Sequence, residues 1–168
     1  MTGHKVYVRH SGVKPQDRLQ IPLIKHCVRT ALMAEGVRAP CEVSVLIVDD
    51  KEIKKLNREH RGIDKPTDVL SFPMQALTPG GPKAETGAID PDTGRLPLGD
   101  IVLSAERIDA QARAFGQTRE REMAYLIAHS VLHLLGYDHP DGSEGKKKMR
   151  GREKAIMREI EGISDDDK

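Results

Sequence analysis

The chain has 168 residues, about the size of one ordinary domain, so we expect a single domain spanning residues 1–168. Its charge is nearly balanced, with 27 Lys and Arg against 26 Asp and Glu, and it contains no Trp. This composition argues against a strongly basic nucleic-acid or membrane binder and against a broad base-stacking surface, so any site for a polyanion has to be local.

Targeting signals and a cysteine framework are both missing from the sequence pattern. Residues 1–12 lack the apolar core of a signal peptide, and the longest apolar runs, such as residues 45–48, are far too short to span a bilayer. We therefore expect a cytoplasmic protein with no membrane partner. Cys27 and Cys41 are not spaced as a redox or metal-binding pair, which favours free, buried thiols.

The first half of the chain predicts two strands and two helices. In chain order they are a strand at residues 5–10, a helix that begins at Pro22 and ends near Gly36, a strand at residues 42–49 and a short helix capped by Asp49 or Asp50. The second strand is β-branched and nearly continuous in apolar residues, which is typical of an inner strand covered on both faces.

Two further strands are predicted at residues 67–73 and 98–104. A Pro- and Gly-rich stretch, residues 74–97, separates them. A connection of this length is uncommon in a compact domain, so we expect a mobile loop at residues 74–97. Its role as a functional flap or as a tolerated surface insertion stays open.

Three helices follow these strands. Ser104 and Thr118 are suitable caps for the first two, and the last covers roughly residues 144–161 with a basic run at residues 146–150. The second of these helices is apolar almost all round from residue 123 to residue 135, so it should lie in the core. The predicted fold class is α/β, a small mixed sheet of about four strands packed with about five helices, with the strand order left open.

The end of the core helix carries three histidines, in the motif 129-HSVLHLLGYDH-139. Residues four apart on an α-helix lie one turn along the axis and only about 40° apart around it, so His129 and His133 present their imidazoles to a common point. Gly136 can adopt the left-handed conformation that ends a helix, which would let the chain turn back and bring His139 to the same point.

This spacing predicts a metal site. Three nitrogens on one side of Zn²⁺ leave the fourth tetrahedral position for water, so we expect about one zinc ion per chain, held by His129, His133 and His139. A closed structural zinc site would need a fourth protein ligand, which no cysteine motif supplies. A lone histidine would be read as an ordinary core or surface residue, but three around a helix-ending glycine favour the metal.

The spacing HxxxHxxGxxH is also that of the metzincin peptidases, in which a glutamate follows the first histidine as general base. Here that position is Ser130, and a serine hydroxyl is a poor general base. This difference argues against ordinary peptide hydrolysis. Asp138 is the nearest carboxylate and can orient a ligand or a turn.

Several ordered segments resemble the YbeY-type endoribonucleases, a family of ribosomal-RNA maturation factors. The segment 129-HSVLHLLGYDH-139 looks like their metal motif, and 56-LNREHRGIDKPTDVLSFP-73 and 98-LGDIVLS-104 are similar to their other characteristic segments. The resemblance extends from roughly Val43 to Met157. Position 130 is commonly Gly in that family and is Ser here, and the segment at residues 74–97 is longer than expected.

The resemblance implies a zinc-dependent, single-strand-specific endoribonuclease. The implied role is maturation of ribosomal RNA, especially the 3′ end of the small-subunit RNA, and ribosome quality control. The implied partners are single-stranded or ribosomal RNA and the ribosome or small-subunit proteins, with no DNA. The family's three zinc-binding histidines correspond to His129, His133 and His139, and its functional arginine corresponds to Arg61.

A cation such as Arg61 has a clear use in phosphodiester cleavage, because negative charge builds up on the non-bridging oxygens and a guanidinium matches their geometry. From the residues alone, Arg61 is better explained as an exposed cation at a helix end, where a cation is favourable. Arg58, Lys65 and the basic run at residues 146–150 can extend a phosphate-binding surface.

Three functions from different classes therefore stay open: a metal-dependent endoribonuclease, a zinc metallopeptidase, and a non-catalytic ribosome- or RNA-binding factor with structural zinc. Zinc removal separates them, because a structural metal predicts global unfolding, whereas a catalytic metal predicts lost cleavage with the fold largely retained.

Overall fold

The computed structural model describes residues 3–79, 89–138 and 143–162. These ranges contain a four-stranded sheet and five α-helices, which confirms the predicted α/β fold class. The strands are β1 (Lys5–His10), β2 (Cys41–Val48), β3 (Val69–Pro73) and β4 (Leu96–Ser104), and the helices are α1 (Ile21–Ala34), α2 (Asp50–Arg61), α3 (Ala105–Ala114), α4 (Arg119–Leu134) and α5 (Ser143–Glu161). None of the described helices combines the length and the apolar character that a membrane span requires.

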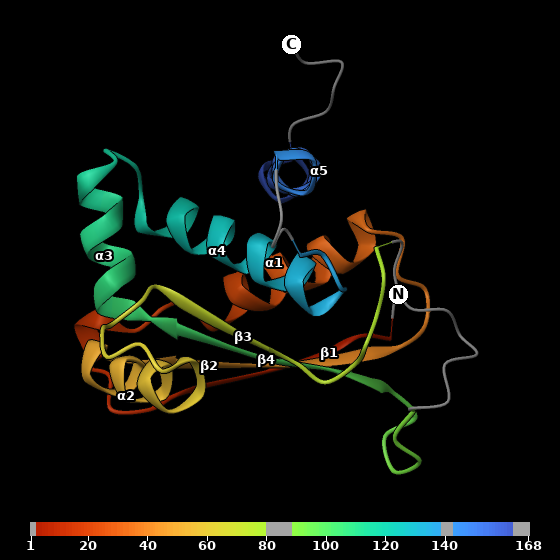
Figure 1. The fold of residues 1–168 in the computed structure, drawn as a ribbon, viewed down its shortest axis with the longest axis horizontal. Helices are drawn as coiled ribbons and strands as arrows, with labels where there is room; N and C mark the ends of the chain where they lie inside the picture. The colour runs from red at the N-terminus through yellow and green to blue at the C-terminus, as the bar shows by residue number, and fades with distance from the viewer. Residues whose placement is uncertain (1–2, 80–88, 139–142, 163–168) are drawn as a thin grey trace.

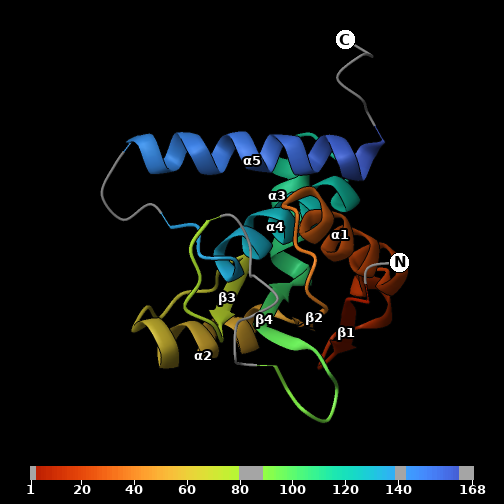
Figure 2. The same cartoon turned by 90° about the vertical axis from the view of Figure 1, so that its right-hand side faces the viewer.

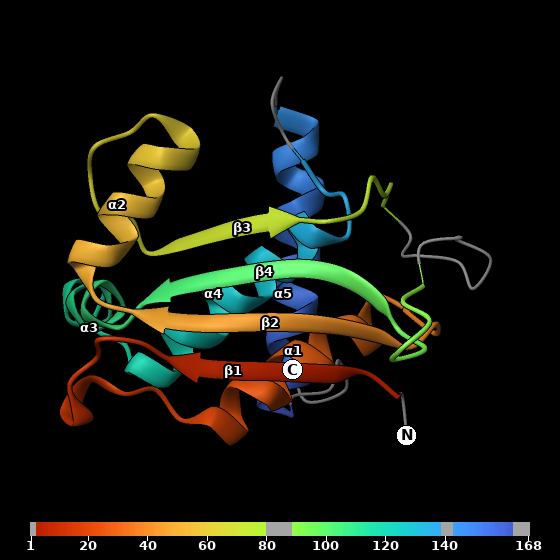
Figure 3. The same ribbon diagram turned by 90° about the horizontal axis from the view of Figure 1, so that it is seen from below.

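The sheet is mixed, and its order is β1-β2-β4-β3 (Figure 3). Strands β1, β2 and β4 are parallel, and β3 runs antiparallel to β4. In the register, Val45 of β2 pairs with Val8 on one side and Ile101 on the other, and Ser71 of β3 pairs with Ile101. Strand β3 is therefore an edge strand of the described sheet.

The helices lie mainly on one side of the sheet. Helices α1 and α4 pack side by side above it, and α5 crosses over both as an outer layer (Figures 1 and 2). Between these helices and the sheet lies the main hydrophobic core, which includes the fully buried Ile24, Ile101, Ile127 and Leu132. The helix that bears the histidine motif is thus central, as predicted.

The opposite side of the sheet is only partly covered. Helix α2 packs there over a small core made of Val48, Ile53, Leu70 and Val102. The prediction that the second strand is covered on both faces is wrong for part of its length, because Ser44 of β2 is exposed. The physical reason is that α2 covers one end of this face and leaves the rest to solvent (Figure 3).

The predicted helix caps are confirmed. The Asp49 side chain accepts a hydrogen bond from the Glu52 amide at 2.9 Å and begins α2. Ser104 and Thr118 do the same for α3 and α4, with oxygen to nitrogen distances of 3.2 and 3.1 Å. Each cap supplies an acceptor for an amide that has no partner within its own helix, and so sets where the helix begins.

The segment predicted as a mobile loop, residues 74–97, is described in part, and residues 80–88 lie outside the described residues. Its two flanks are packed against each other: the Met74 amide donates to the Leu98 carbonyl at 2.9 Å, and the Gln75 side chain donates to the Pro97 carbonyl at 2.8 Å. Strand β4 begins at Leu96, two residues before the predicted start.

Both cysteines are buried and free, as predicted. Burial raises the pKa of each thiol to about 12. Neutral thiols of this kind are poor nucleophiles and poor metal ligands, so Cys27 and Cys41 act as small core side chains.

Candidate metal centre

Helix α4 holds two of the predicted ligands in the geometry that their spacing predicts. His129 and His133 lie one turn apart and are both half-buried. Their Nε2 atoms are 3.0 Å apart, and their ring centroids are 4.5 Å apart. The remaining residues of this turn, including Leu132 and Leu134, are fully buried in the main core, which fixes the helix and therefore the two rings.

The other ring nitrogens are held by acceptors. Nδ1 of His129 lies 2.9 Å from Oε2 of Glu153 on α5, and Nδ1 of His133 lies 3.0 Å from the carbonyl oxygen of Tyr137. A carbonyl and a carboxylate accept hydrogen bonds, so each Nδ1 is assigned the proton and each Nε2 presents its lone pair. Two lone pairs at 3.0 Å repel each other unless a proton or a metal ion lies between them. The donor set therefore fits a cation.

Glu153 is the residue that the sequence pattern did not identify as part of the site. It is only 5% exposed, and it lies on the buried side of α5 near Met149 and Ile156. A lone carboxylate within an apolar helix stripe was the available signal, because a buried acid normally needs a partner. Here the partner is His129, an arrangement that commonly orients a metal-binding imidazole.

A second, partly buried network holds the carbonyl that faces His133. The hydroxyl of Tyr137 donates to Oε1 of Glu35 at 2.7 Å, and Nε of Arg152 donates to Oε2 of the same carboxylate at 2.7 Å. Burial, together with the Glu35 carboxylate, raises the pKa of Tyr137 to about 12, so its hydroxyl stays protonated and remains a donor. Helices α1 and α5 thus fix the turn that follows α4.

The turn at the end of α4 requires glycine. Gly136 has a φ of 97°, and a Cβ at this position would lie 2.1 Å from the carbonyl oxygen of Leu77. The amide of Tyr137 donates to the Leu132 carbonyl at 3.0 Å, so the chain reverses there as predicted. His139, the third predicted ligand, lies outside the described residues, and within residues 3–79, 89–138 and 143–162 no group of three candidate ligands comes together.

The histidines open onto a groove of about 690 Å³ that follows the edge strand β3. It is lined by all of β3, by Thr67 and Asp68, by His60 and Arg61 of α2, by His129 and His133 of α4, and by Asp138. Alternate residues of β3 face opposite sides: Leu70 packs under α2, and Ser71 faces α4. Arg61 and the histidines therefore border one groove from the two sides of β3.

Arg61 is exposed at the last position of α2. Its Nη1 lies 3.5 Å from Oδ1 of Asn57, and the buried Asn57 amide donates to the Lys65 carbonyl at 2.9 Å. The other predicted cations are not brought to this groove. Arg58 faces Asp64 at 3.9 Å, and neither Lys65 nor residues 146–150 are among the described residues that line it.

Ser130, at the position of a metzincin base, is fully buried. Its Oγ lies 2.5 Å from Oγ of Ser71 on β3, so the hydroxyl joins α4 to the edge strand. This contact is a second feature that the sequence pattern did not reveal, because nothing in the sequence places residue 71 beside residue 130.

Comparisons with known proteins place these features in one family. A family model described as "Endoribonuclease YbeY" matches residues 9–161. A protein named endoribonuclease YbeY from Clostridium kluyveri is 44% identical over 156 residues, which cover 89% of this chain and 94% of the relative. One of the same name from Acetivibrio thermocellus is 41% identical over 150 residues, with 86% and 92% covered. The solution structure of TM1509 from Thermotoga maritima matches with a TM-score of 0.59 and 26% identity, over 94% of this chain and 89% of that one.

Proposed function

The chain belongs to the endoribonuclease YbeY family, and on that premise we propose that it is a metal-dependent endoribonuclease that hydrolyses phosphodiester bonds of single-stranded RNA. One observation carries the metal dependence: the Nε2 atoms of His129 and His133 face each other at 3.0 Å while both Nδ1 atoms are held by acceptors. The arrangement fits a metal ion and opens onto a groove.

The proposed metal is one zinc ion, with His129, His133 and His139 as its ligands. Imidazole nitrogens suit zinc, and three of them leave a coordination position open. When bound, such an ion supplies Lewis acidity for a water molecule or for a phosphoryl oxygen. The chain's own contribution is orientation, because Glu153 and the Tyr137 carbonyl hold the rings of His129 and His133 with Nε2 toward the groove.

Arg61 is the proposed partner of the phosphate. Its guanidinium can donate two parallel hydrogen bonds to non-bridging oxygens, on which negative charge develops as the phosphodiester is cleaved. The 3.5 Å contact with Asn57 is at the limit of a hydrogen bond, so a phosphate can replace it at little cost. The residue borders the same groove as the histidines.

The proposed substrate is ribosomal RNA in single-stranded form, with maturation of the small-subunit RNA 3′ end as the role and the ribosome or its small-subunit proteins as partners. The resemblance to the family supports this role. A groove of about 690 Å³ along one edge strand also suits a single strand better than a duplex. Because ribosomal RNA is the proposed substrate, we also propose a cytoplasmic location.

The peptidase alternative has no support in the site. The hydroxyl that replaces the metzincin glutamate is fully buried and is paired with Ser71, so it does not reach a substrate in the groove. A non-catalytic factor with structural zinc remains the competing hypothesis, and it predicts a different response to metal removal.

The test is the metal content of the purified chain by mass spectrometry, together with cleavage of a single-stranded RNA. We expect about one zinc ion per chain in the wild type and a loss of both zinc and cleavage in His133→Ala. We expect Arg61→Ala to retain zinc and to cleave about a hundredfold or more slowly, because it lacks the donor for the developing charge.

Arg58→Ala is the matched control, because Arg58 lies one turn earlier on α2 and faces Asp64. This variant should cleave as the wild type does. Bound zinc without any RNA cleavage by the wild type would contradict the endoribonuclease proposal. Unfolding of the chain on mild chelation, seen by circular dichroism, would favour structural zinc instead.

A further inference from the structure

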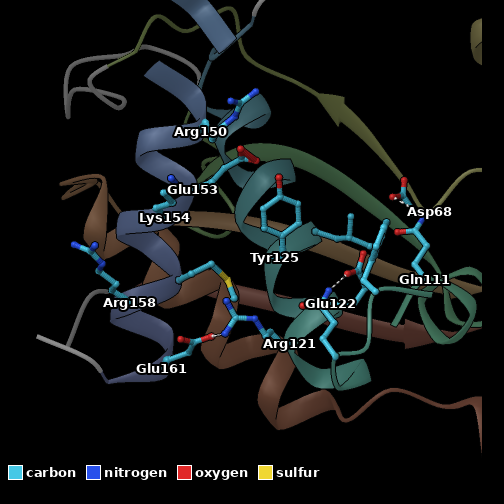
Figure 4. A pocket seen from close by; sticks show the side chains of 14 residues that line it. Asp68, Gln111, Arg121, Glu122, Tyr125, Arg150, Glu153, Lys154, Arg158 and Glu161 are labelled. Carbon is cyan, nitrogen blue, oxygen red and sulfur yellow. Dashed lines mark hydrogen bonds and ion pairs between the residues drawn. The ribbon is translucent and has the colours of Figure 1, made fainter. Parts of the chain in front are cut away.

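A second groove, which we call the α4–α5 groove, lies between α4, α5 and the end of α3 and has a volume of about 920 Å³ (Figure 4). It lies beside the metal centre. Its wall includes Glu153, whose carboxylate holds His129, and Asp68 lines both this groove and the histidine groove. The two grooves are therefore neighbours that share Asp68.

Aromatic rings are available along this groove. Tyr125 of α4 is 41% exposed and stands in the middle of it, and Phe115 at the end of α3 is 70% exposed (Figure 4 labels Tyr125). The chain has only five Phe and Tyr residues and no Trp, so two exposed rings on one groove are a concentration of this residue type. An exposed ring beside cations is the usual platform for an unpaired base.

Cations face these rings from α5. Arg150 and Lys154 are exposed, lie one helical turn apart on α5 and both line the groove (Figure 4 labels them). Arg150 ends the basic run at residues 146–150, and Lys154 lies one turn beyond it. The structure places both residues on the wall of one groove.

The acids of the groove are engaged within the protein. Glu153 Oε2 lies 2.9 Å from Nδ1 of His129. Glu161 is paired with Arg121 at 2.6 Å, and Asp68 accepts from the Gln111 side chain at 3.1 Å. Glu122, the remaining acid that lines the groove, is buried and accepts a hydrogen bond from the Gln117 side chain. These carboxylates therefore have partners within the protein, whereas Arg150 and Lys154 are exposed to a ligand.

We propose that the α4–α5 groove binds the stretch of single-stranded RNA that continues beyond the scissile phosphodiester, with one base stacked on Tyr125 and phosphates held by Arg150 and Lys154. This inference rests on the proposed nuclease function. Stacking is tolerant of base identity, so the groove contributes affinity and a preference for unpaired, longer substrates and does not select a sequence.

The test compares a short RNA of about four nucleotides with a long RNA of about twelve nucleotides. The short RNA can fill only the cleavage site, whereas the long RNA can also fill the α4–α5 groove. Affinity for the long RNA is measured by stopped-flow anisotropy before cleavage, and kcat/KM is measured for both. The groove variants are Tyr125→Leu and the double variant Arg150→Gln/Lys154→Gln. Lys51→Gln/Lys55→Gln, with two exposed cations at the same spacing on α2, is the matched charge control.

For Tyr125→Leu we expect about tenfold weaker binding of the long RNA, with the affinity restored in Tyr125→Phe, because the ring and not the hydroxyl stacks. If the hydroxyl and not the ring were responsible, Tyr125→Phe would bind the long RNA as weakly as Tyr125→Leu. For Arg150→Gln/Lys154→Gln, the slope of log affinity against log salt concentration should fall by about 1.4, which corresponds to two phosphate contacts on a single strand. The kcat/KM advantage of the long RNA should shrink in both groove variants.

Equal losses in Arg150→Gln/Lys154→Gln and in Lys51→Gln/Lys55→Gln would overturn the groove proposal, because general charge would then explain the binding. The groove proposal would also be overturned if every variant kept the wild-type preference for long RNA. The groove would then be assigned to a protein partner. A wild type that binds long RNA through this groove but cleaves neither RNA would contradict the nuclease function and retain the groove. Cleavage of both RNAs without any effect of Tyr125→Leu would retain the nuclease function and contradict the groove proposal.

Discussion

The two sides of the histidine groove rest on different supports. The histidines project from α4, which is packed into the main core between the sheet, α1 and α5. Arg61 ends α2, which is held on the other side of the sheet by the small core of Val48, Ile53, Leu70 and Val102. One side of the site is therefore built into the most buried helix of the fold, and the other is carried by a helix with only Ile53 and Asn57 buried.

This difference matches the role that we propose for each side. Metal ligands need fixed positions, since small displacements of an imidazole weaken coordination. An arginine that follows a phosphate needs some freedom, and segments with few buried apolar contacts open locally at a lower free energy than the core. The comparison teaches that the rigid and the adaptable parts of one site are placed on separate hydrophobic cores.

The largest expected effect is a contrast between the two cores in stability. Leu132→Ala removes a fully buried side chain between the histidines and should lower the free energy of unfolding by about 3–5 kcal/mol, because the main core cannot collapse around the cavity. Ile53→Ala should cost about 2–3 kcal/mol, since the small core has partly exposed neighbours that can relax. Urea denaturation measures both values.

Amide hydrogen exchange shows whether the cores are separate. Ile53→Ala should speed exchange in α2 and leave α4 protected, whereas Leu132→Ala should speed exchange throughout the chain. If Ile53→Ala speeds amide exchange in α4 as much as in α2, the two cores form one cooperative unit, and the two sides of the groove do not have separate supports.

The next effect concerns metal affinity, which should depend on α4 and α5 and not on α2. Glu153→Gln keeps an acceptor for Nδ1 of His129 but removes the charge, so we expect zinc affinity to fall by about tenfold, within the range for residues that orient a ligand. Competition with a chromogenic chelator measures this without any assay of activity. Glu159→Gln, at an exposed position on the same helix, is the control and should bind zinc normally.

Local patterns were enough to predict much of this molecule. The caps at Asp49, Ser104 and Thr118, the core helix and the facing pair His129 and His133 all follow from periodicity and spacing over a few residues, which is where sequence patterns have a direct physical cause. The strand order, with β4 inserted between β2 and β3, depends on long-range packing and was not predictable.

The missed residues share one property, which is that their partners are distant in the sequence. Glu153 meets His129 from 24 residues away, and Ser71 meets Ser130 from 59 residues away. The exposed part of β2 was missed for a related reason, because its apolar run does not reveal how far α2 extends over the sheet. Periodicity predicts that a face is apolar, whereas tertiary packing decides what covers it.

The smallest expected effect tests the link between the two sides. The Ser71–Ser130 hydrogen bond joins α4 to β3, and the neighbouring Leu70 lies in the small core under α2, so this contact is a direct connection between the two supports. Ser130→Ala should lower the free energy of unfolding by about 1 kcal/mol, since the Ser71 hydroxyl borders the groove and can turn to water. Zinc content should not change, because the alanine keeps the helix and the packing around His129.

A double-mutant cycle with Ser71→Ala isolates this link. If the hydrogen bond couples α4 to β3, the two single variants and the double variant should have similar stabilities, with a coupling free energy of about 0.5–1.5 kcal/mol. Amide hydrogen exchange should then become faster in β3 and α2 while α4 stays protected. The reason is that loss of the Ser71–Ser130 hydrogen bond uncouples β3 and α2 from α4. Strictly additive losses would mean that the two hydroxyls act independently, and the connection between the arginine and histidine sides would have to lie elsewhere along β3.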